Sequence, residues 1–119
     1  MEKINIDEKL ANFTDLWSPK IIGELNGQCV KLAKVKGKFV WHAHENEDEL
    51  FYVIKGRLTI EFRDGEVVLN EGEVCIVPKK VEHRPTAEEE THILLFEPQK
   101  TAHTGKVRSE LTVDAQKYI

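Results

Sequence analysis

The sequence predicts an all-β fold of many short strands, preceded by one short helix. From residue 20 to about residue 97 the apolar residues alternate with polar ones, and this period of two is typical of a strand. Asn26-Gly27 and Asp64-Gly65 are strong signals for tight hairpin turns, and Gly56 and Gly72 interrupt the pattern between further strands. Many short strands with turn signals this close together indicate a sandwich, a jelly roll or a barrel.

The short helix is predicted from residue 5 to about residue 13. Asn5 suits the N-cap position, and Glu8 stands three residues later, as in a capping box. Apolar residues then recur at helical spacing, at Ile6, Leu10 and Phe13. The helix ends before Ser18-Pro19, because a proline disfavours helical geometry in the residue before it. We expect this helix to pack on the main body as a lid or flap, outside any functional site.

The predicted strands follow one another along the chain. They cover residues 21–25, 29–35, 39–44, 50–55, 58–62, 66–69, 74–77 and 91–96. The alternation slips near Leu32 and Ala33, which predicts a β-bulge there. The three glutamates at 88–90 are expected to form a solvated hairpin turn. The polar tail either adds a strand near residues 106–111 or covers a neighbouring subunit.

Composition predicts one soluble globular domain over residues 1–119, with 40% hydrophobic and 32% charged residues. A net charge of −4 argues against a nucleic-acid partner, which requires a basic face. No apolar run approaches the ~20 residues that span a bilayer, and the first residues lack the apolar core of a secretory signal. Cys29 and Cys75 are expected to be buried reduced thiols, with a disulfide as the alternative. These features predict a cytoplasmic protein without a membrane partner.

Candidate metal ligands gather in the middle of the chain. His42 and His44 stand two residues apart, so on a strand both imidazoles point to one face. Glu49 follows an acidic turn and opens the next strand, and His83 lies in the second half of the chain. Three neutral imidazoles and one carboxylate form a good donor set for a divalent transition metal. Asp48 is the alternative to Glu49, which the strand register favours.

The predicted strand 39–44 divides its side chains between two faces. Val40 shares a face with the two histidines, whereas Phe39, Trp41 and Ala43 take the other face. Phe51 points into the same space as the histidines, which predicts a polar group at the mouth of an apolar cavity. Buried imidazoles and carboxylates are costly without partners, and a metal ion satisfies them. Four protein ligands leave one or two positions open on a five- or six-coordinate ion.

The spacing of these residues resembles two sequence motifs of the cupin superfamily. Gly37, the two histidines, Glu49 and Gly56 resemble the first motif, although the first gap is one residue shorter than usual. The second motif is resembled by Gly72, Pro78 and His83, whose gaps are as expected. Two positions depart from that second motif: Lys80 replaces the usual glycine, and Ala87 stands where an asparagine is common.

The resemblance implies a double-stranded β-helix, which is a small jelly-roll cupin barrel. The core barrel would cover about residues 30–97, after an N-terminal helix and strands at 5–29 and before a tail at 98–119. It implies that one divalent transition-metal ion (Fe, Mn, Ni, Zn, Co or Cu) is held by His42, His44, Glu49 and His83. It also implies a homodimer in which strands 21–25 and 29–35 add to the partner's sheet, because pairing covers open sheet edges.

Three functions follow from a metal-binding small cupin. The first is a metal-dependent enzyme of oxygenase, isomerase or lyase type that acts on a small organic molecule. The second is a module that binds or senses a small ligand, such as a sugar or an organic acid, with the metal as its anchor. The third gives the metal a structural role only.

Three further residues have more than one interpretation. His92 is expected to be a core or pocket histidine, with a place beside the metal as the alternative. Lys80 and Arg84 flank His83, where they either meet an anionic ligand or are solvated charges in a loop.

Overall fold

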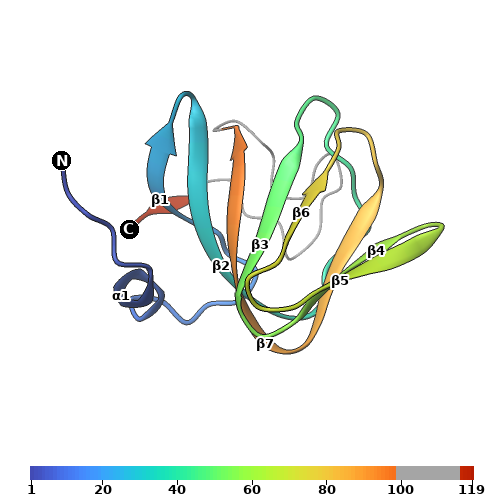
Figure 1. The fold of residues 1–119 in the computed structure, drawn as a ribbon, viewed down its shortest axis with the longest axis horizontal. Coiled ribbons are helices and arrows are strands. Elements are labelled where there is room, and N and C mark those ends of the chain that lie inside the picture. The colour runs from blue at the N-terminus through green and yellow to red at the C-terminus, as the bar shows by residue number, and fades with distance from the viewer. Residues whose placement is uncertain (99–115) are drawn as a thin grey trace.

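A computed structural model describes residues 1–98 and 116–119 of the chain. Its elements are α1 (Ile6–Leu10), β1 (Lys20–Leu25), β2 (Gln28–Lys38), β3 (Glu49–Lys55), β4 (Leu58–Phe62), β5 (Gly65–Leu69), β6 (Val74–Val77), β7 (His83–Pro98) and β8 (Lys117–Tyr118). The predicted all-β fold with one short N-terminal helix is confirmed. In Figure 1, α1 lies at one end of the molecule beside β1, and β4 and β5 lie at the other end.

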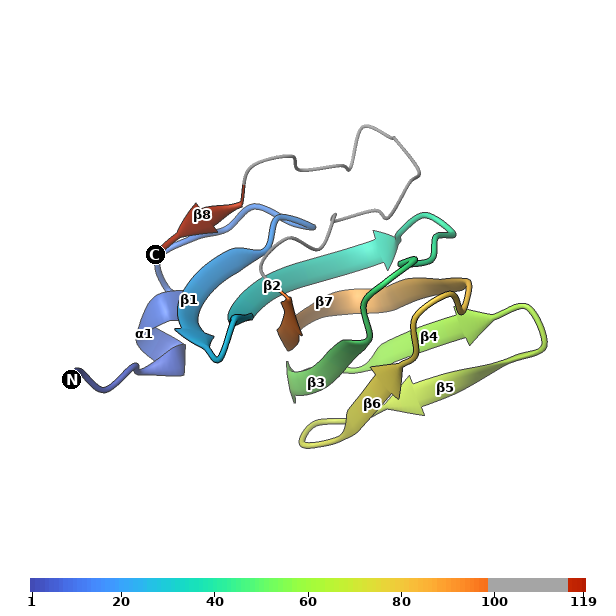
Figure 2. The same cartoon turned by 90° about the horizontal axis from the view of Figure 1, so that it is seen from above.

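The long strand β7 organises the sheet. Its first residues pair antiparallel with β4, from His83 opposite Phe62 to Thr86 opposite Thr59. Its later residues pair with β3, and β2 runs along nearly all of its other edge. The sheet therefore has the order β5-β4-β7-β2-β1-β8, and β3 with its partner β6 branches from β7. Figure 2 shows β7 passing between β2 on one side and β3 and β4 on the other.

The N-terminal elements agree with most of the sequence expectations. The Asn5 side chain accepts a hydrogen bond from the Glu8 amide at 3.0 Å, which confirms the N-cap, although the helix ends at Leu10. Asn26 and Gly27 both have positive φ, at 51° and 77°, as a type I′ hairpin requires. The bulge predicted near residues 32–33 is wrong: the register shifts lie between residues 21 and 23 and between residues 35 and 37.

Two predicted elements in the middle of the chain are wrong. Residues 39–44 do not form a strand, and only an isolated bridge joins His42 to His83. The glutamates at 88–90 lie within β7 and do not form a hairpin turn. They form a bulge: on β7 three residues lie between the paired positions 87 and 91, whereas on β2 only Lys36 lies between their partners at 37 and 35. A bulge leaves all three glutamate side chains exposed, so their charge costs little.

Two further expectations concern chain segments near turns. The hairpin predicted at Asp64-Gly65 is present, but Gly65 already pairs with Phe62, so its loop is Arg63-Asp64. The strand suggested near residues 106–111 lies outside the described residues. Cys29 and Cys75 are free thiols, as expected, but only Cys29 is buried, and Cys75 is partly exposed. Among the described helical residues, none form a helix that is both long and apolar enough for a membrane span.

Apolar side chains pack on both sides of the sheet. The inner cluster fills the barrel and includes Val53, Leu58 and Ile60, which are fully buried. On the outer side, Leu10 and Phe13 pack on Leu32 of β2, so the N-terminal helix covers this face of the sheet. The expectation that the helix packs on the main body is confirmed. The inner cluster borders the candidate site, and the outer cluster is separated from it by the sheet.

The loop between β6 and β7 takes a left-handed turn at the position where the cupin motif usually has glycine. Lys80 has a φ of 71°, and its amide donates a hydrogen bond to the His44 carbonyl at 2.7 Å. A left-handed residue with a side chain costs roughly 1–2 kcal/mol compared with its preferred conformation. The left-handed turn therefore forms with lysine at this position. Its hydrogen bond connects the loop to the segment that carries the histidines.

Replacing Lys80 by glycine should raise the free energy of unfolding by about 1 kcal/mol, because the left-handed conformation then carries no steric strain. Urea unfolding of Lys80→Gly and wild type measures the difference. Lys79→Gly is the matched control, because Lys79 is also exposed but has no positive φ, and it should be less stable than wild type. Equal destabilisation of both variants would contradict the prediction.

Candidate metal centre

The four predicted ligands come from three separate segments that the backbone ties together. His42 and His44 lie between β2 and β3, Glu49 is the first residue of β3, and His83 is the first residue of β7. The His42 amide donates to the His83 carbonyl at 3.0 Å, and the His83 amide donates to the His42 carbonyl at 2.9 Å. This reciprocal bridge, with the bond from Lys80 to His44, fixes the histidine segment against the end of β7.

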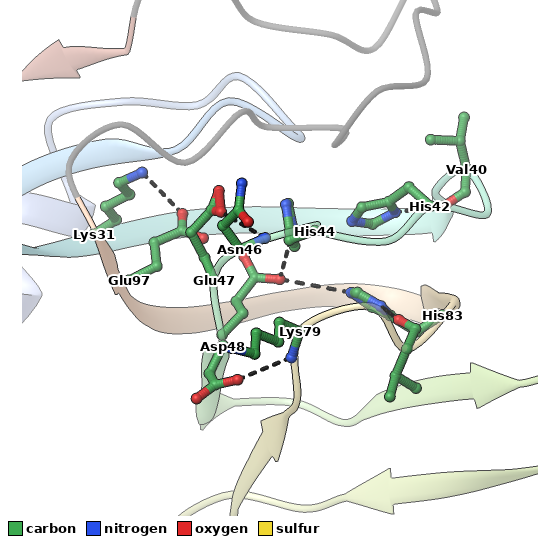
Figure 3. A network of polar contacts seen from close by, with 12 residues as sticks. Lys31, Val40, His42, His44, Asn46, Glu47, Asp48, Lys79, His83 and Glu97 are labelled. Atoms are coloured by element: carbon green, nitrogen blue, oxygen red, sulfur yellow. Dashed lines mark hydrogen bonds and ion pairs between the residues drawn. The ribbon is translucent and has the colours of Figure 1, made fainter.

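The four side chains converge inside the barrel. One potential ligand atom from each lies within 4.8 Å of all the others, and all four residues are buried. Nε2 of His44 is 3.4 Å from Oε1 of Glu49, and Nε2 of His83 is 3.6 Å from the same oxygen. Figure 3 shows the imidazoles of His42, His44 and His83 turned toward a common space.

Hydrogen bonds to the backbone set the tautomers of two histidines. Nδ1 of His42 lies 2.9 Å from the Val40 carbonyl, and Nδ1 of His83 lies 2.9 Å from the Val81 carbonyl. Because a carbonyl only accepts, each Nδ1 carries the proton and each Nε2 keeps a lone pair. Metal-bound histidines usually have such an outer hydrogen bond, which fixes the orientation of the ring.

Several buried polar atoms of the cluster have no hydrogen-bond partner among the described residues. They are Nε2 of His83 and both ring nitrogens of His44. Leaving a buried polar atom unpaired costs roughly 1–3 kcal/mol, so a group that accepts the nitrogen lone pairs would stabilise the site. A divalent transition metal is such a group, and three imidazoles with one carboxylate suit it. The residues present therefore fit a metal ion.

Burial and neighbouring charges favour the protonation states that bind metals. Burial lowers the pKa of His42 from 6.5 to about 4, and the nearby His83 adds to this effect, so the imidazole is neutral at neutral pH. Burial raises the pKa of Glu49, but the adjacent imidazoles of His44 and His83 outweigh it and hold the pKa well below its usual range. The cluster thus presents a neutral imidazole at His42 and a carboxylate at Glu49.

A small apolar cavity adjoins the cluster. Its volume is about 30 Å³, and it reaches His42 and Glu49 between walls that include Trp17, Phe39 and Phe51. This volume is room for about two water molecules. A larger, shallow hollow of about 920 Å³ lies on β4, β5 and β7 and contains none of the four predicted ligands. The small cavity is therefore the space in which a molecule would meet the cluster.

Comparison with known proteins decides the family. A family model described as the cupin domain matches residues 30–97. The chain belongs to the cupin family. The crystal structure of a cupin-2 domain protein from Shewanella frigidimarina is 47% identical, with a TM-score of 0.80, over 81% of this cupin and 94% of that chain. NMB1881 from Neisseria meningitidis is 34% identical, with a TM-score of 0.75, over 82% of this cupin and all of that chain.

One relative in sequence adds to this assignment. YdbB, an uncharacterised protein of Bacillus subtilis, is 41% identical to this cupin over 80 residues. The match covers 66% of this cupin and 65% of YdbB. Together with the family match, the Shewanella structure confirms the predicted jelly-roll barrel.

Some residues near this cupin's cluster differ from the sequence expectation. Phe39 does not face away from the histidines, because its segment is not a strand. It lines the cavity and meets the His42 ring edge-on, with 5.4 Å between the ring centroids. His92 lies on the other face of β7 and contacts Glu90 at 2.9 Å, so it stands outside the cluster. By contrast, Asp48 agrees with the expectation that favoured Glu49: it is exposed, accepts a hydrogen bond from the Lys79 amide and does not replace Glu49 in the cluster.

The two cations that flank His83 are not equivalent. Arg84 pairs with Glu61 at 2.6 Å and lies over the Trp41 ring at 4.9 Å, so its charge is already engaged. Arg84 belongs to β7 and is not in a loop. Lys80 is exposed, and its backbone has the role in the turn described above.

Sequence reasoning missed three residues of this region. Trp17 lines the cavity and stacks on Phe39, with 4.7 Å between the ring centroids. Its indole N–H donates a hydrogen bond to the Lys36 carbonyl at 2.8 Å. Lys31 and Glu97 form a buried ion pair at 2.8 Å. Strand alternation was an available signal for this pair, because it places both charged residues among inward-facing apolar ones.

Acid should destabilise chelator-treated protein through His42. Its pKa of about 4 in the folded state is below the unfolded value of 6.5, so the unfolded chain binds the proton first as the pH falls. The stability from neutral His42 is complete above pH 6.5 and declines by up to about 3 kcal/mol as the pH falls to 4. Urea unfolding between pH 7 and pH 4 should show a shallower decline for His42→Asn. Parallel curves would contradict this.

Proposed function

We propose that this cupin binds one divalent transition-metal ion through His42, His44, Glu49 and His83. The observation that carries the proposal is the convergence of four buried donors, with the His44 and His83 Nε2 atoms lacking a hydrogen-bond partner among the described residues. The donor set suits Fe, Mn, Ni, Zn, Co and Cu, and all these ions are candidates. The hydrogen bonds from Nδ1 of His42 and His83 to backbone carbonyls support it, because they orient both rings in advance.

We further propose that the metal serves an enzymatic reaction on a small organic molecule. A divalent metal supplies Lewis-acid chemistry at the positions that its protein ligands leave open. Phe51 and Leu95 give the adjoining cavity apolar walls, and His42 and Glu49 are its polar groups. Oxygenation, isomerisation and lyase chemistry all agree with this arrangement.

The alternative is a module that binds or senses a small ligand, with the metal as its anchor. The cavity volume of about 30 Å³ limits the enzyme and the module alike to very small ligands unless side chains of its wall move. Conversion of added small molecules under air would support the enzyme. Stoichiometric binding without product would support the module, and unfolding on metal removal without ligand binding would support a structural metal.

Protein purified without an affinity tag should contain about one transition-metal ion per chain by elemental analysis. His42→Ala should lose the metal, because it removes one of four donors. His92→Ala is the matched control: His92 lies on the opposite face of β7, paired with Glu90, and its loss should leave the metal content unchanged. Wild-type protein that is free of metal and cannot be reconstituted would refute the proposal.

We also propose that this cupin forms a homodimer, as its family resemblance suggested. Part of β1 is already paired within the chain, because Lys20 and Ile21 lie beside β8. The outer side of β6, β3 and β7 offers a different surface. Ile76 lies opposite Leu50, and Leu50 lies opposite Phe96, so apolar side chains form a continuous row across three strands. Ile76 is 59% exposed, and a second chain on this row would cover it.

Light scattering at micromolar concentration should give the mass of two chains. Ile76→Lys should shift the protein toward the monomer, because it places a charge in the apolar row. The variant should still fold, because the Ile76 side chain is exposed in the single chain. Val67→Lys is the control, since Val67 is also exposed but belongs to β5. A monomeric wild type would refute the dimer, and an unaffected Ile76→Lys would refute this surface.

A further inference from the structure

An ion pair inside the barrel lies outside the four predicted metal ligands. Nζ of Lys31 lies 2.8 Å from Oε1 of Glu97, and the two side chains are only 1% and 3% exposed. Figure 3 shows this pair in the same view as the three histidines. Removing two charges from water costs several kcal/mol per ion, and hydrophobic residues of similar size often serve stability equally well. Stability alone therefore gives little reason for this pair.

The strand register places Glu97 beside the predicted ligand Glu49. In the antiparallel ladder of β3 and β7, Leu50 lies opposite Phe96. The next positions, Glu49 before Leu50 and Glu97 after Phe96, therefore face each other. Both residues are buried, whereas Leu50 and Phe96 are only partly buried, so the two carboxyl groups share the inner face.

One carboxylate oxygen of Glu97 is paired and the other is not. Oε2 of Glu97 is buried and has no donor among the described residues, while Oε1 is held by Lys31. Oε1 of Glu49 lies 3.4 Å from Nε2 of His44 and 3.6 Å from Nε2 of His83. The strand register therefore places the Lys31–Glu97 pair beside the carboxylate that meets both imidazoles.

We propose that Lys31 and Glu97 are a positioning pair that holds the Glu49 carboxylate in the orientation in which it ligates the metal. This inference rests on the proposed metal site. A glutamate side chain has several rotatable bonds, so a ligand at the start of a strand needs a fixed neighbour to keep one orientation. Lys31 fixes Glu97, and Glu97 limits Glu49. Outer partners of metal ligands typically contribute a factor of 10 to 100 in metal affinity.

The decisive variant is the double substitution Lys31→Met with Glu97→Leu. It removes one positive and one negative charge, so the net charge around the metal stays the same. It should fold, because apolar replacement of a buried ion pair is often neutral or stabilising. Co²⁺ affinity, measured by competition with a chromophoric chelator, should fall about tenfold or more. The visible absorption spectrum of the Co²⁺ protein should also change, because Glu49 no longer holds one orientation.

Two single substitutions refine the test. Glu97→Gln keeps an acceptor for Lys31 and offers an N–H donor to Glu49, so its Co²⁺ affinity and spectrum should stay close to those of wild type. Glu97→Met offers neither and should behave like the double variant. Lys20→Met is the matched control, because Lys20 is also buried and pairs with Asp15 at 2.8 Å, away from the cluster. It should leave the Co²⁺ affinity and spectrum unchanged.

The outcomes separate this inference from the proposed metal site. Wild-type protein that binds no Co²⁺ would overturn the metal site and the inference with it. Wild-type binding combined with equal affinity and an unchanged spectrum in the double variant would overturn only the positioning role. If circular dichroism shows that the double variant does not fold, Glu97→Met decides by the same criterion. Equal loss in Glu97→Gln and Glu97→Met would also overturn it, because glutamine keeps the acceptor for Lys31 and a polar group beside Glu49.

Discussion

The structure depends on how a barrel interior accommodates three imidazoles and a carboxylate. Each of these groups loses its water on burial, and the chain supplies only part of the compensation. Backbone carbonyls satisfy Nδ1 of His42 and of His83, and the remaining nitrogens turn inward with Glu49. The part that is not compensated would be offset by a bound cation. In the proposed metal site, the same groups would therefore weaken the metal-free fold and favour metal binding.

The sheet topology brings these four side chains together through a single long strand. β7 is 16 residues long, and it borders β4 near its start and β3 near its end. His83 at its start and Glu49 at the start of β3 are thereby brought to one interior. The reciprocal bridge between His42 and His83 then fixes the remaining segment without a strand. One long strand and one pair of backbone hydrogen bonds define the positions of the four side chains.

Much of the fold was predictable from the sequence because alternation reports directly on burial. Some strands with clear alternation, such as β4 with Leu58 and Ile60 inward, were located within a residue or two of their ends. The predicted strand 91–96 missed the start of β7 by eight residues, and the predicted strand 29–35 ended three residues before β2 does. The segment 39–44 misled because the His-x-His spacing also suits a strand. Its true conformation is fixed by a distant partner, His83, which local pattern cannot reveal. The glutamates at 88–90 misled because a bulge and a turn require the same polar residues.

The members of the candidate site were predicted more fully than its surroundings. The four donors follow from residue type and motif spacing. Lys31 and Glu97 escaped notice because a charged residue in a strand usually faces water, and only pairing between strands shows that these two meet. Trp17 escaped because it precedes the first strand, and its contact with Phe39 spans more than twenty residues of intervening chain.

The Trp17 side chain also limits the size of the ligands that the cavity can hold. Trp17 is held in the cavity wall by one indole hydrogen bond and one ring stack, each contributing about 1 kcal/mol. Its backbone has a φ of 57°, a left-handed conformation that costs roughly 1–2 kcal/mol. A guest larger than this space would have to displace a wall side chain such as Trp17 before it met His42 and Glu49. Its apparent affinity would then be reduced by the fraction of molecules in which that side chain is displaced.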